Sequence, residues 1–146
     1  EGRLPVYRYV CGKLALQVMP EKCYAVLSAT RAVFFDAADE WCRRMKVTIN
    51  KSAFTNHTYP ILNKRIAKLV KLVKKLATET KNYNRAYPGI LNYCFTVLGL
   101  NIMDDRKDKR LARQIAGTLE YMGLEFYEAQ MAPYEDEQIA KNGDVF

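Results

Sequence analysis

Residues 59–81 constrain the fold more than any other segment, because their pattern is that of one strongly amphipathic helix. At about 100° per residue, one continuous half of this helix is apolar. That half contains Ile61, Leu62, Ile66, Leu69, Val70, Leu72, Val73 and Leu76. The opposite half carries Lys64, Lys68, Lys71, Lys74 and Lys75. Arg65 falls on the apolar side, and Glu79 is the only acid. An apolar half of this width requires a packing partner, so the segment belongs to a larger helical assembly.

The rest of the chain is compatible with such an assembly. Seven Gly and five Pro in 146 residues are few, which favours helices over a turn-rich β fold. We therefore predict an all-α fold, a single domain over residues 1–146 built as a bundle of about five helices. Apolar spacing predicts a helix over residues 6–19 that ends at Pro20, and a central helix from Glu21 to at least Lys46. Residues 1–5 are expected to be extended.

Proline and glycine divide the remaining segments. The pattern leaves open whether Pro60 breaks the chain or kinks one long helix. A short apolar helix is expected to begin near Pro88, with Gly99 as its C-cap. The last helix is predicted from about Asp105 to Gln130, capped by Asp104 or Asp105 and ended by Pro133. The acidic segment 134–146 is expected to be loosely held.

Charge is strongly segregated along the sequence. Residues 43–113 carry 17 basic and 4 acidic side chains, whereas residues 114–146 carry 1 basic and 7 acidic ones. A positive field of this kind attracts anionic lipid, sulfated glycans, acidic proteins or nucleic acid. The candidate binding residues are Lys64, Lys68, Lys71, Lys74, Lys75, Arg106, Lys107, Lys109 and Arg110. Specific nucleic-acid binding is not expected, because the stripe is rich in lysine and lacks a known module.

The predicted bundle has more apolar residues than an interior of about five helices can cover, so we expect an exposed apolar patch beside the lysines. Tyr121 and Leu124 are the named candidates, because they project from the charged side of the last helix. A homodimer contact is the alternative way to cover them.

Enzymatic chemistry is not expected. The chain has one histidine, His57, and two serines, Ser28 and Ser52, and no glycine-rich phosphate loop. Asp36, Asp39 and Glu40 suggest a metal site, but a carboxylate di-metal bundle also needs Glu-x-x-His pairs on two helices. We therefore predict neither a cofactor nor a metal.

Four cysteines bear on the cellular compartment. Cys11, Cys23, Cys42 and Cys94 allow two disulfides in three pairings, or four free buried thiols. The chain starts Glu1-Gly2 instead of Met, for which a cleaved secretory signal is one explanation. The triplets that begin at Asn50 and Asn56 match the N-glycosylation pattern.

Two stretches resemble a known family. Asn56-His57-Thr58 followed by Ile61-Leu62-Asn63-Lys64-Arg65-Ile66, and then Asn82-Tyr83-Asn84-Arg85, are similar to abalone sperm lysin. The resemblance covers roughly residues 50–115. Lysin is richer in arginine and lacks the four cysteines, so the chain looks more like the fusagenic acrosomal sperm proteins that are paralogous to lysin.

This resemblance implies a lysin-like bundle of five helices that is stored in the acrosomal secretory vesicle and secreted on exocytosis. It further implies a non-enzymatic role in fertilisation, promoting fusion of the sperm and egg membranes through a cationic, amphipathic surface. Its partner would be an anionic membrane or an egg-coat polyanion or glycoprotein. Non-enzymatic dissolution of the egg envelope is the alternative within the family. A secreted helical receptor ligand or a polyanion-binding module is the alternative of another class.

Overall fold

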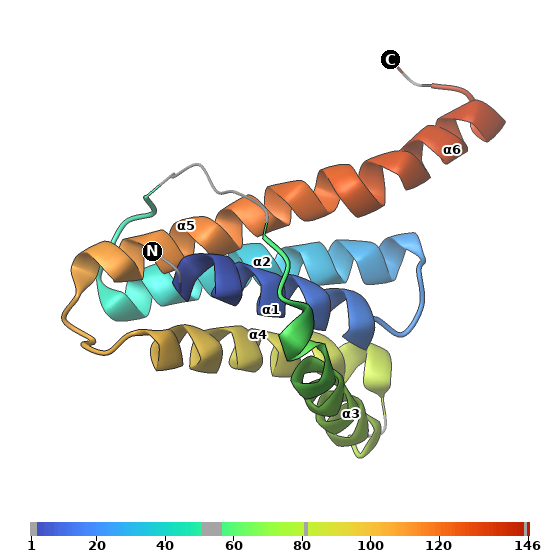
Figure 1. Cartoon of the computed structure of the whole chain (residues 1–146). Coiled ribbons are helices and arrows are strands. Elements are labelled where there is room, and N and C mark those ends of the chain that lie inside the picture. Colours follow the sequence, from blue (N-terminus) through green and yellow to red (C-terminus); the bar gives the residue numbers. More distant parts are fainter. Residues whose placement is uncertain (1–2, 51–56, 81, 145) are drawn as a thin grey trace.

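The chain folds as an all-α bundle, as the apolar pattern predicts. A computed structural model describes residues 3–50, 57–80, 82–144 and 146, and these contain no β-strand. The α-helices are α1 (Arg3–Val18), α2 (Tyr24–Met45), α3 (Asn63–Thr78), α4 (Tyr83–Ile102), α5 (Lys109–Phe126) and α6 (Ala132–Asn142). A π-helical segment, η2 (Tyr127–Met131), joins α5 to α6, so these two helices form one long rod whose end projects from the bundle (Figure 1).

The predicted central helix is confirmed. α2 packs against both α4 and α5, and its buried residues extend along most of its length. The ring of Phe34 on α2 stacks on Phe95 of α4 at 5.0 Å between centroids and lies 6.0 Å from Phe126 of α5. α1 contacts α3, α4 and α5, whereas α3 lies across the edge of the bundle against α1 and α4 (Figure 1).

Two predicted starts are wrong near the N-terminus. The segment expected to be extended is helical from Arg3, with Pro5 in the first turn of α1. Proline is accepted there because the first N–H groups of a helix have no intrahelical partner. α2 begins at Tyr24 with Cys23 as its N-cap, three residues after the predicted start at Glu21.

The interpretation of α4 from Pro88 and Gly99 is also wrong. α4 begins at Tyr83, capped by the Asn82 side chain, which accepts from the backbone N–H of Arg85 at 3.3 Å. Pro88 therefore lies inside the helix. Gly99 is buried three residues before the end, where a Cβ would lie 2.9 Å from Cζ3 of Trp41. This glycine permits close packing against α2 and does not cap the helix.

The predicted end of the last helix at Pro133 is wrong as well. α5 begins at Lys109, and its N-cap is Asp108, whose carboxylate accepts from the N–H of Leu111 at 3.1 Å. Pro133 is the second residue of α6 and follows the wider turns of η2. Proline has no N–H to donate to the carbonyl four residues earlier, and its ring crowds that carbonyl. The wider π turn before Pro133 leaves room for the ring and does not need that hydrogen bond. The segment expected to be loose is therefore helical to Asn142.

α2 and α3 are separate helices and do not form one long helix kinked at Pro60. α2 ends at Met45, and its C-cap Lys46 adopts the left-handed conformation, with φ of 56°. The N–H of Asn50 donates to the carbonyl of Arg113 on α5 at 3.3 Å. Pro60 then opens a single 3₁₀ turn, η1 (Pro60–Leu62), that leads into α3. Of the two glycosylation-type triplets, Lys51, Ser52 and Asn56 lie outside the described residues, whereas Asn50 is described and exposed.

Candidate functional site

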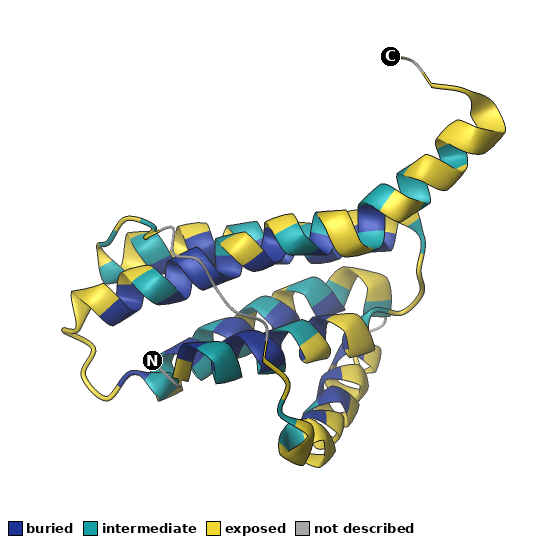
Figure 2. Ribbon diagram, turned by 45° about the horizontal axis from the view of Figure 1, so that its top comes forward, coloured by how far each residue is buried: buried dark blue, intermediate teal, exposed yellow. Residues whose placement is uncertain are grey.

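α3 is attached to the bundle by its first turn and by one narrow apolar row. The hydroxyl of Tyr9 on α1 donates to Oδ1 of Asn63 at 2.6 Å, and the ring of Tyr59 meets the ring of Tyr9 edge-on at 5.7 Å. The buried residues of α3 are Ile66, Val70, Val73 and Ala77. Their spacing of three and four residues places them on one line along the helix. In Figure 2, α3 is accordingly dark blue along one side and yellow over most of its surface.

A second apolar row, on α3 and on the turn η1 that precedes it, stays exposed. Ile61 is 87% exposed, Leu72 is 64% exposed and Leu76 is 51% exposed, while Leu69 between them is half-buried. The sequence predicted a single apolar half, but the contact with α1 and α4 covers only part of it. Three of the eight apolar residues predicted for this segment therefore face away from the bundle.

The predicted lysines border this exposed row. Lys64, Lys68, Lys71, Lys74 and Lys75 are all exposed, and so is Arg65. Lys68 lies four residues before Leu72 and Lys75 three residues after it, so both flank that side chain on the helix surface. Within the part of the chain that the structure describes, none of these six basic residues forms an ion pair. We call this set the α3 surface: Ile61, Lys64, Arg65, Lys68, Lys71, Leu72, Lys74, Lys75 and Leu76.

The second predicted basic cluster lies apart from the α3 surface. Arg106, Lys107, Lys109 and Arg110 are exposed in the corner that follows α4, whereas α3 is joined to the start of α4 (Figure 1). A helix of 20 residues spans about 30 Å, so the clusters lie toward opposite ends of that length. The amino group of Lys109 also donates to the carbonyl of Met45 at 2.6 Å, which ties the corner to α2.

Tyr121 and Leu124 are exposed as predicted, at 38% and 53%, but their surroundings are acidic. Leu124 has Glu120 and Glu128 one turn before and after it on the same rod. The ring of Tyr121 lies 5.8 Å from the guanidinium carbon of Arg8, whose charge is paired with Glu125. These two residues therefore do not extend the lysine-bordered surface.

All four cysteines are free thiols in the structure. Burial raises the pKa of the Cys11 thiol, and the nearby Cys94 raises it further. Burial likewise raises the pKa of Cys94 and, with the added effect of Asp39 and Glu120, that of Cys42. A raised pKa keeps a thiol protonated at neutral pH, so these three are poor nucleophiles.

The described residues offer neither a metal-binding cluster nor a membrane-spanning helix. No cluster of three or more His, Cys, Asp or Glu side chains gathers in a way that would hold a metal ion. None of the helices in the described residues has the length and hydropathy that a membrane span requires.

Comparison with known families places the α3 surface within a recognised domain. Residues 59–145 match the family described as Domain of unknown function (DUF6899), which is more than half of the chain. The chain belongs to the DUF6899 family. The matched region begins at the tyrosine that packs beside α3 and includes α3 to α6. No curated protein and no solved structure matches the chain significantly.

Sequence reasoning found the lysines of α3 and the exposure of Tyr121 and Leu124, but it did not identify which apolar residues of η1 and α3 stay exposed. Helical periodicity predicts the direction in which each side chain points. It does not predict how much of the apolar side the neighbouring helices cover. The one signal in the sequence was Arg65, a basic residue among the apolar positions, which lies on the side of the helix that stays exposed.

Proposed function

We propose that this protein acts without catalysis, by binding anionic membrane surfaces through the α3 surface. The observation that carries the proposal is the exposed row of Ile61, Leu72 and Leu76 beside unpaired basic residues. A soluble helix usually intersperses glutamate with lysine, because like charges one turn apart repel. α3 keeps that repulsion and also leaves aliphatic side chains in water, and an anionic lipid surface would relieve both.

The expected energies are sufficient for reversible binding. Each Lys or Arg close to an anionic leaflet contributes about 1 kcal/mol. Burying one aliphatic side chain fully contributes about 1.5–3 kcal/mol, which the three exposed residues would gain only in part. An interfacial helix lies parallel to the membrane plane, with its apolar side below the headgroups. α3 would do so while its buried row keeps it attached to α1 and α4.

The resemblance to the lysin family supplies a biological setting for the proposal. In that setting the protein is stored in an acrosomal vesicle, is released at fertilisation and promotes fusion of sperm and egg membranes. Fusion requires removal of water between two headgroup layers and disturbance of lipid packing. Cationic side chains serve the first requirement and inserted aliphatic side chains the second.

The experiment compares vesicles of phosphatidylcholine alone with vesicles that also contain phosphatidylserine, and measures co-flotation and lipid mixing. Binding is expected only to the anionic vesicles. It should fall as salt rises, because the Debye length shrinks from about 10 Å at 0.1 M to about 3 Å at 1 M. Equal binding to both vesicle types at both salt concentrations would remove the electrostatic part of the proposal.

A pair of charge-reversal variants assigns the binding to α3. The test variant changes Lys64, Lys68, Lys71 and Lys74 to Glu. The control variant changes Lys22, Lys107, Arg110 and Arg113 to Glu, which are also exposed and shift the net charge equally. We expect the test variant to lose vesicle binding at unchanged helicity and the control to keep most of it. Equal loss in both would indicate a diffuse charge effect, and binding of heparin without vesicle binding would favour a polyanion-binding module.

A further inference from the structure

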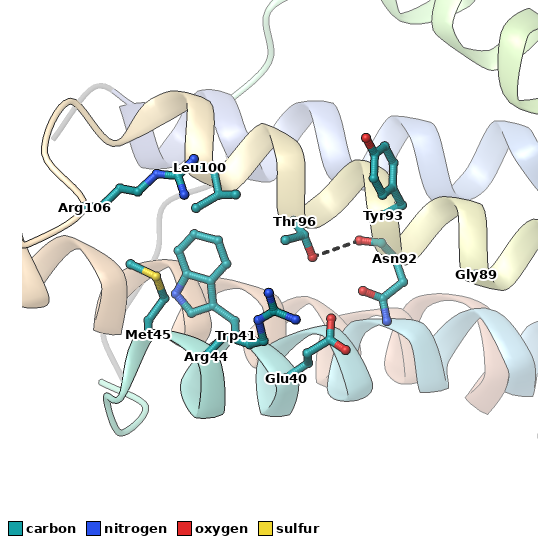
Figure 3. A pocket seen from close by; sticks show the side chains of 10 residues that line it. All are labelled: Glu40, Trp41, Arg44, Met45, Gly89, Asn92, Tyr93, Thr96, Leu100 and Arg106. Atoms are coloured by element: carbon teal, nitrogen blue, oxygen red, sulfur yellow. Dashed lines mark hydrogen bonds between the residues drawn. The ribbon is translucent and has the colours of Figure 1, made fainter.

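A groove between α2 and α4, separate from the α3 surface, has the properties of a ligand site. It encloses about 580 Å³ and is lined by Trp41 and Arg44 of α2, Tyr93, Thr96 and Leu100 of α4, and Arg106 of the following loop (Figure 3). Small-molecule sites usually enclose about 300–1,000 Å³. The α4 residues that line it recur at helical spacing from Gly89 to Leu100, so the groove follows one side of that helix.

The floor of the groove is apolar and fixed. The indole N–H of Trp41 donates to the carbonyl of Ala112 on α5 at 2.9 Å, which orients the ring. Gly99 lets that ring lie directly against α4, because any Cβ would approach it to 2.9 Å. Met45 and Leu100 extend the apolar lining beside the ring. A ligand with an apolar body would therefore meet a preformed surface.

Two guanidinium groups reach the same groove from different segments. Figure 3 shows the side chains of Arg44 and Arg106 directed into it. The loop that carries Arg106 is fixed by Asp105, whose carboxylate accepts from the N–H of Lys107 at 2.9 Å and whose carbonyl accepts from the N–H of Asp108 at 3.0 Å. Neither guanidinium forms an ion pair with any described residue.

We infer that this groove binds an amphiphilic organic anion, a molecule with one apolar chain or ring and one sulfate, carboxylate or phosphate group. Guanidinium groups present paired donors that match the oxygens of such anions. Glu40 is the one acid that lines the groove, against two arginines, so the local charge favours an anion over a cation. The apolar body would lie on Trp41 and Leu100, and the anionic group would contact Arg44 and Arg106.

The only tryptophan of the chain reports on binding directly. Octyl sulfate, kept below its micelle concentration, is titrated into the full chain while Trp41 emission is recorded. A saturable change is expected with octyl sulfate, and a smaller or no change with octanol, inorganic sulfate or octyltrimethylammonium. Octanoate and octyl phosphate then show which anionic group is preferred. An equal response to octyltrimethylammonium, or no saturable response to any of the three anions, would overturn the inference.

Matched variants locate the site. The change Arg44→Ala with Arg106→Ala should weaken binding about tenfold or more, because both charge-assisted contacts to the anionic group are lost. The control, Arg43→Ala with Lys107→Ala, removes the same charge from neighbouring exposed positions outside the groove and should retain affinity within about twofold. Equal weakening in both pairs would contradict the inference.

A further variant keeps the test valid if the double arginine change disturbs folding. Gly89 lines the groove, and a Cβ added there meets no atom within 4 Å, so Gly89→Phe should fold and obstruct the groove. It should weaken octyl sulfate binding, and unchanged affinity in a folded Gly89→Phe protein would count against this location. The four-lysine variant of α3 should keep the full Trp41 response, which separates this site from the proposed membrane function.

Discussion

α3 and α5 are both strongly amphipathic helices of similar length, yet the bundle uses them differently. α5 buries ten of its 18 residues, whereas α3 buries four of its 16. α5 packs against α2, α1 and η2, while the main contacts of α3 within the described bundle are with α1 and α4. An amphipathic pattern therefore shows that a helix has an apolar side but does not show how much of that side the fold covers. Where coverage is incomplete, as on α3, the remainder is available for a partner.

The largest expected difference between the two helices lies in the free energy of unfolding. Ile115 on α5 is fully buried, so Ile115→Ala removes packed methylene groups and should cost about 2–5 kcal/mol. Leu72→Ala on α3 removes an exposed side chain and should change stability by less than about 0.5 kcal/mol. Urea denaturation monitored by circular dichroism measures both values. A cost at Leu72 close to that at Ile115 would mean that the exposed row is covered.

A second, smaller effect tests how closely the bundle packs on α5. A Cβ at Gly117 would lie 2.1 Å from the backbone carbonyl oxygen of Asn50. Backbone cannot rotate away as a side chain can, so Gly117→Ala should cost about 1–3 kcal/mol. Gly89→Ala, where the added Cβ meets open space, should be neutral or stabilise by up to about 1 kcal/mol. Similar results at both glycines would show that helix propensity, and not the contact with Asn50, sets the effect.

Much of this contrast was predictable from the sequence, and the reasons for the failures are physical. Periodicity located α1, α2, α3 and α5, the central position of α2 and the lysine side of α3, but it predicted α4 as a short helix and did not predict α6. The helix ends were harder to predict, because a proline such as Pro88 or Pro133 ends a helix only where the local backbone cannot accommodate it. Gly99 has the sequence signature of a helix C-cap, yet its role is to make room for the ring of Trp41, which is 58 residues away in the chain. The groove brings together Arg44 and Arg106, which are 62 residues apart in the chain, so no local sequence pattern could predict it.

The interior and the α3 surface should also differ in their response to alkaline pH. Burial raises the pKa of Cys11 above its ordinary value of 9.0 and that of Tyr7 above 10.0, while the Tyr7 hydroxyl donates to the carbonyl of Phe95 at 2.8 Å. Above about pH 9 for Cys11 and about pH 10 for Tyr7, the unfolded chain loses the proton and the folded chain keeps it. Stability therefore falls as pH rises, by up to about 1.4 kcal/mol per pH unit for each group.

The variant Cys11→Ala tests the origin of this decline. Removing the buried thiol should flatten the loss of stability just above pH 9, whereas Leu72→Ala should leave the slope unchanged. Urea midpoints measured from pH 7 to pH 10 provide the comparison. An identical slope in Cys11→Ala and the unmodified protein would exclude this thiol as the source.

The central claim, that the exposed row of α3 enters an anionic membrane, is tested most directly by tryptophans placed at two matched leucines. Leu72 and Leu124 are both exposed, but lysines border the first and glutamates the second. In Leu72→Trp, the added emission should shift to shorter wavelength and be quenched by brominated acyl chains when phosphatidylserine vesicles are added. In Leu124→Trp, it should stay unquenched, with buried Trp41 as a constant background in both. Quenching at neither position, or equal quenching at both, would contradict the account.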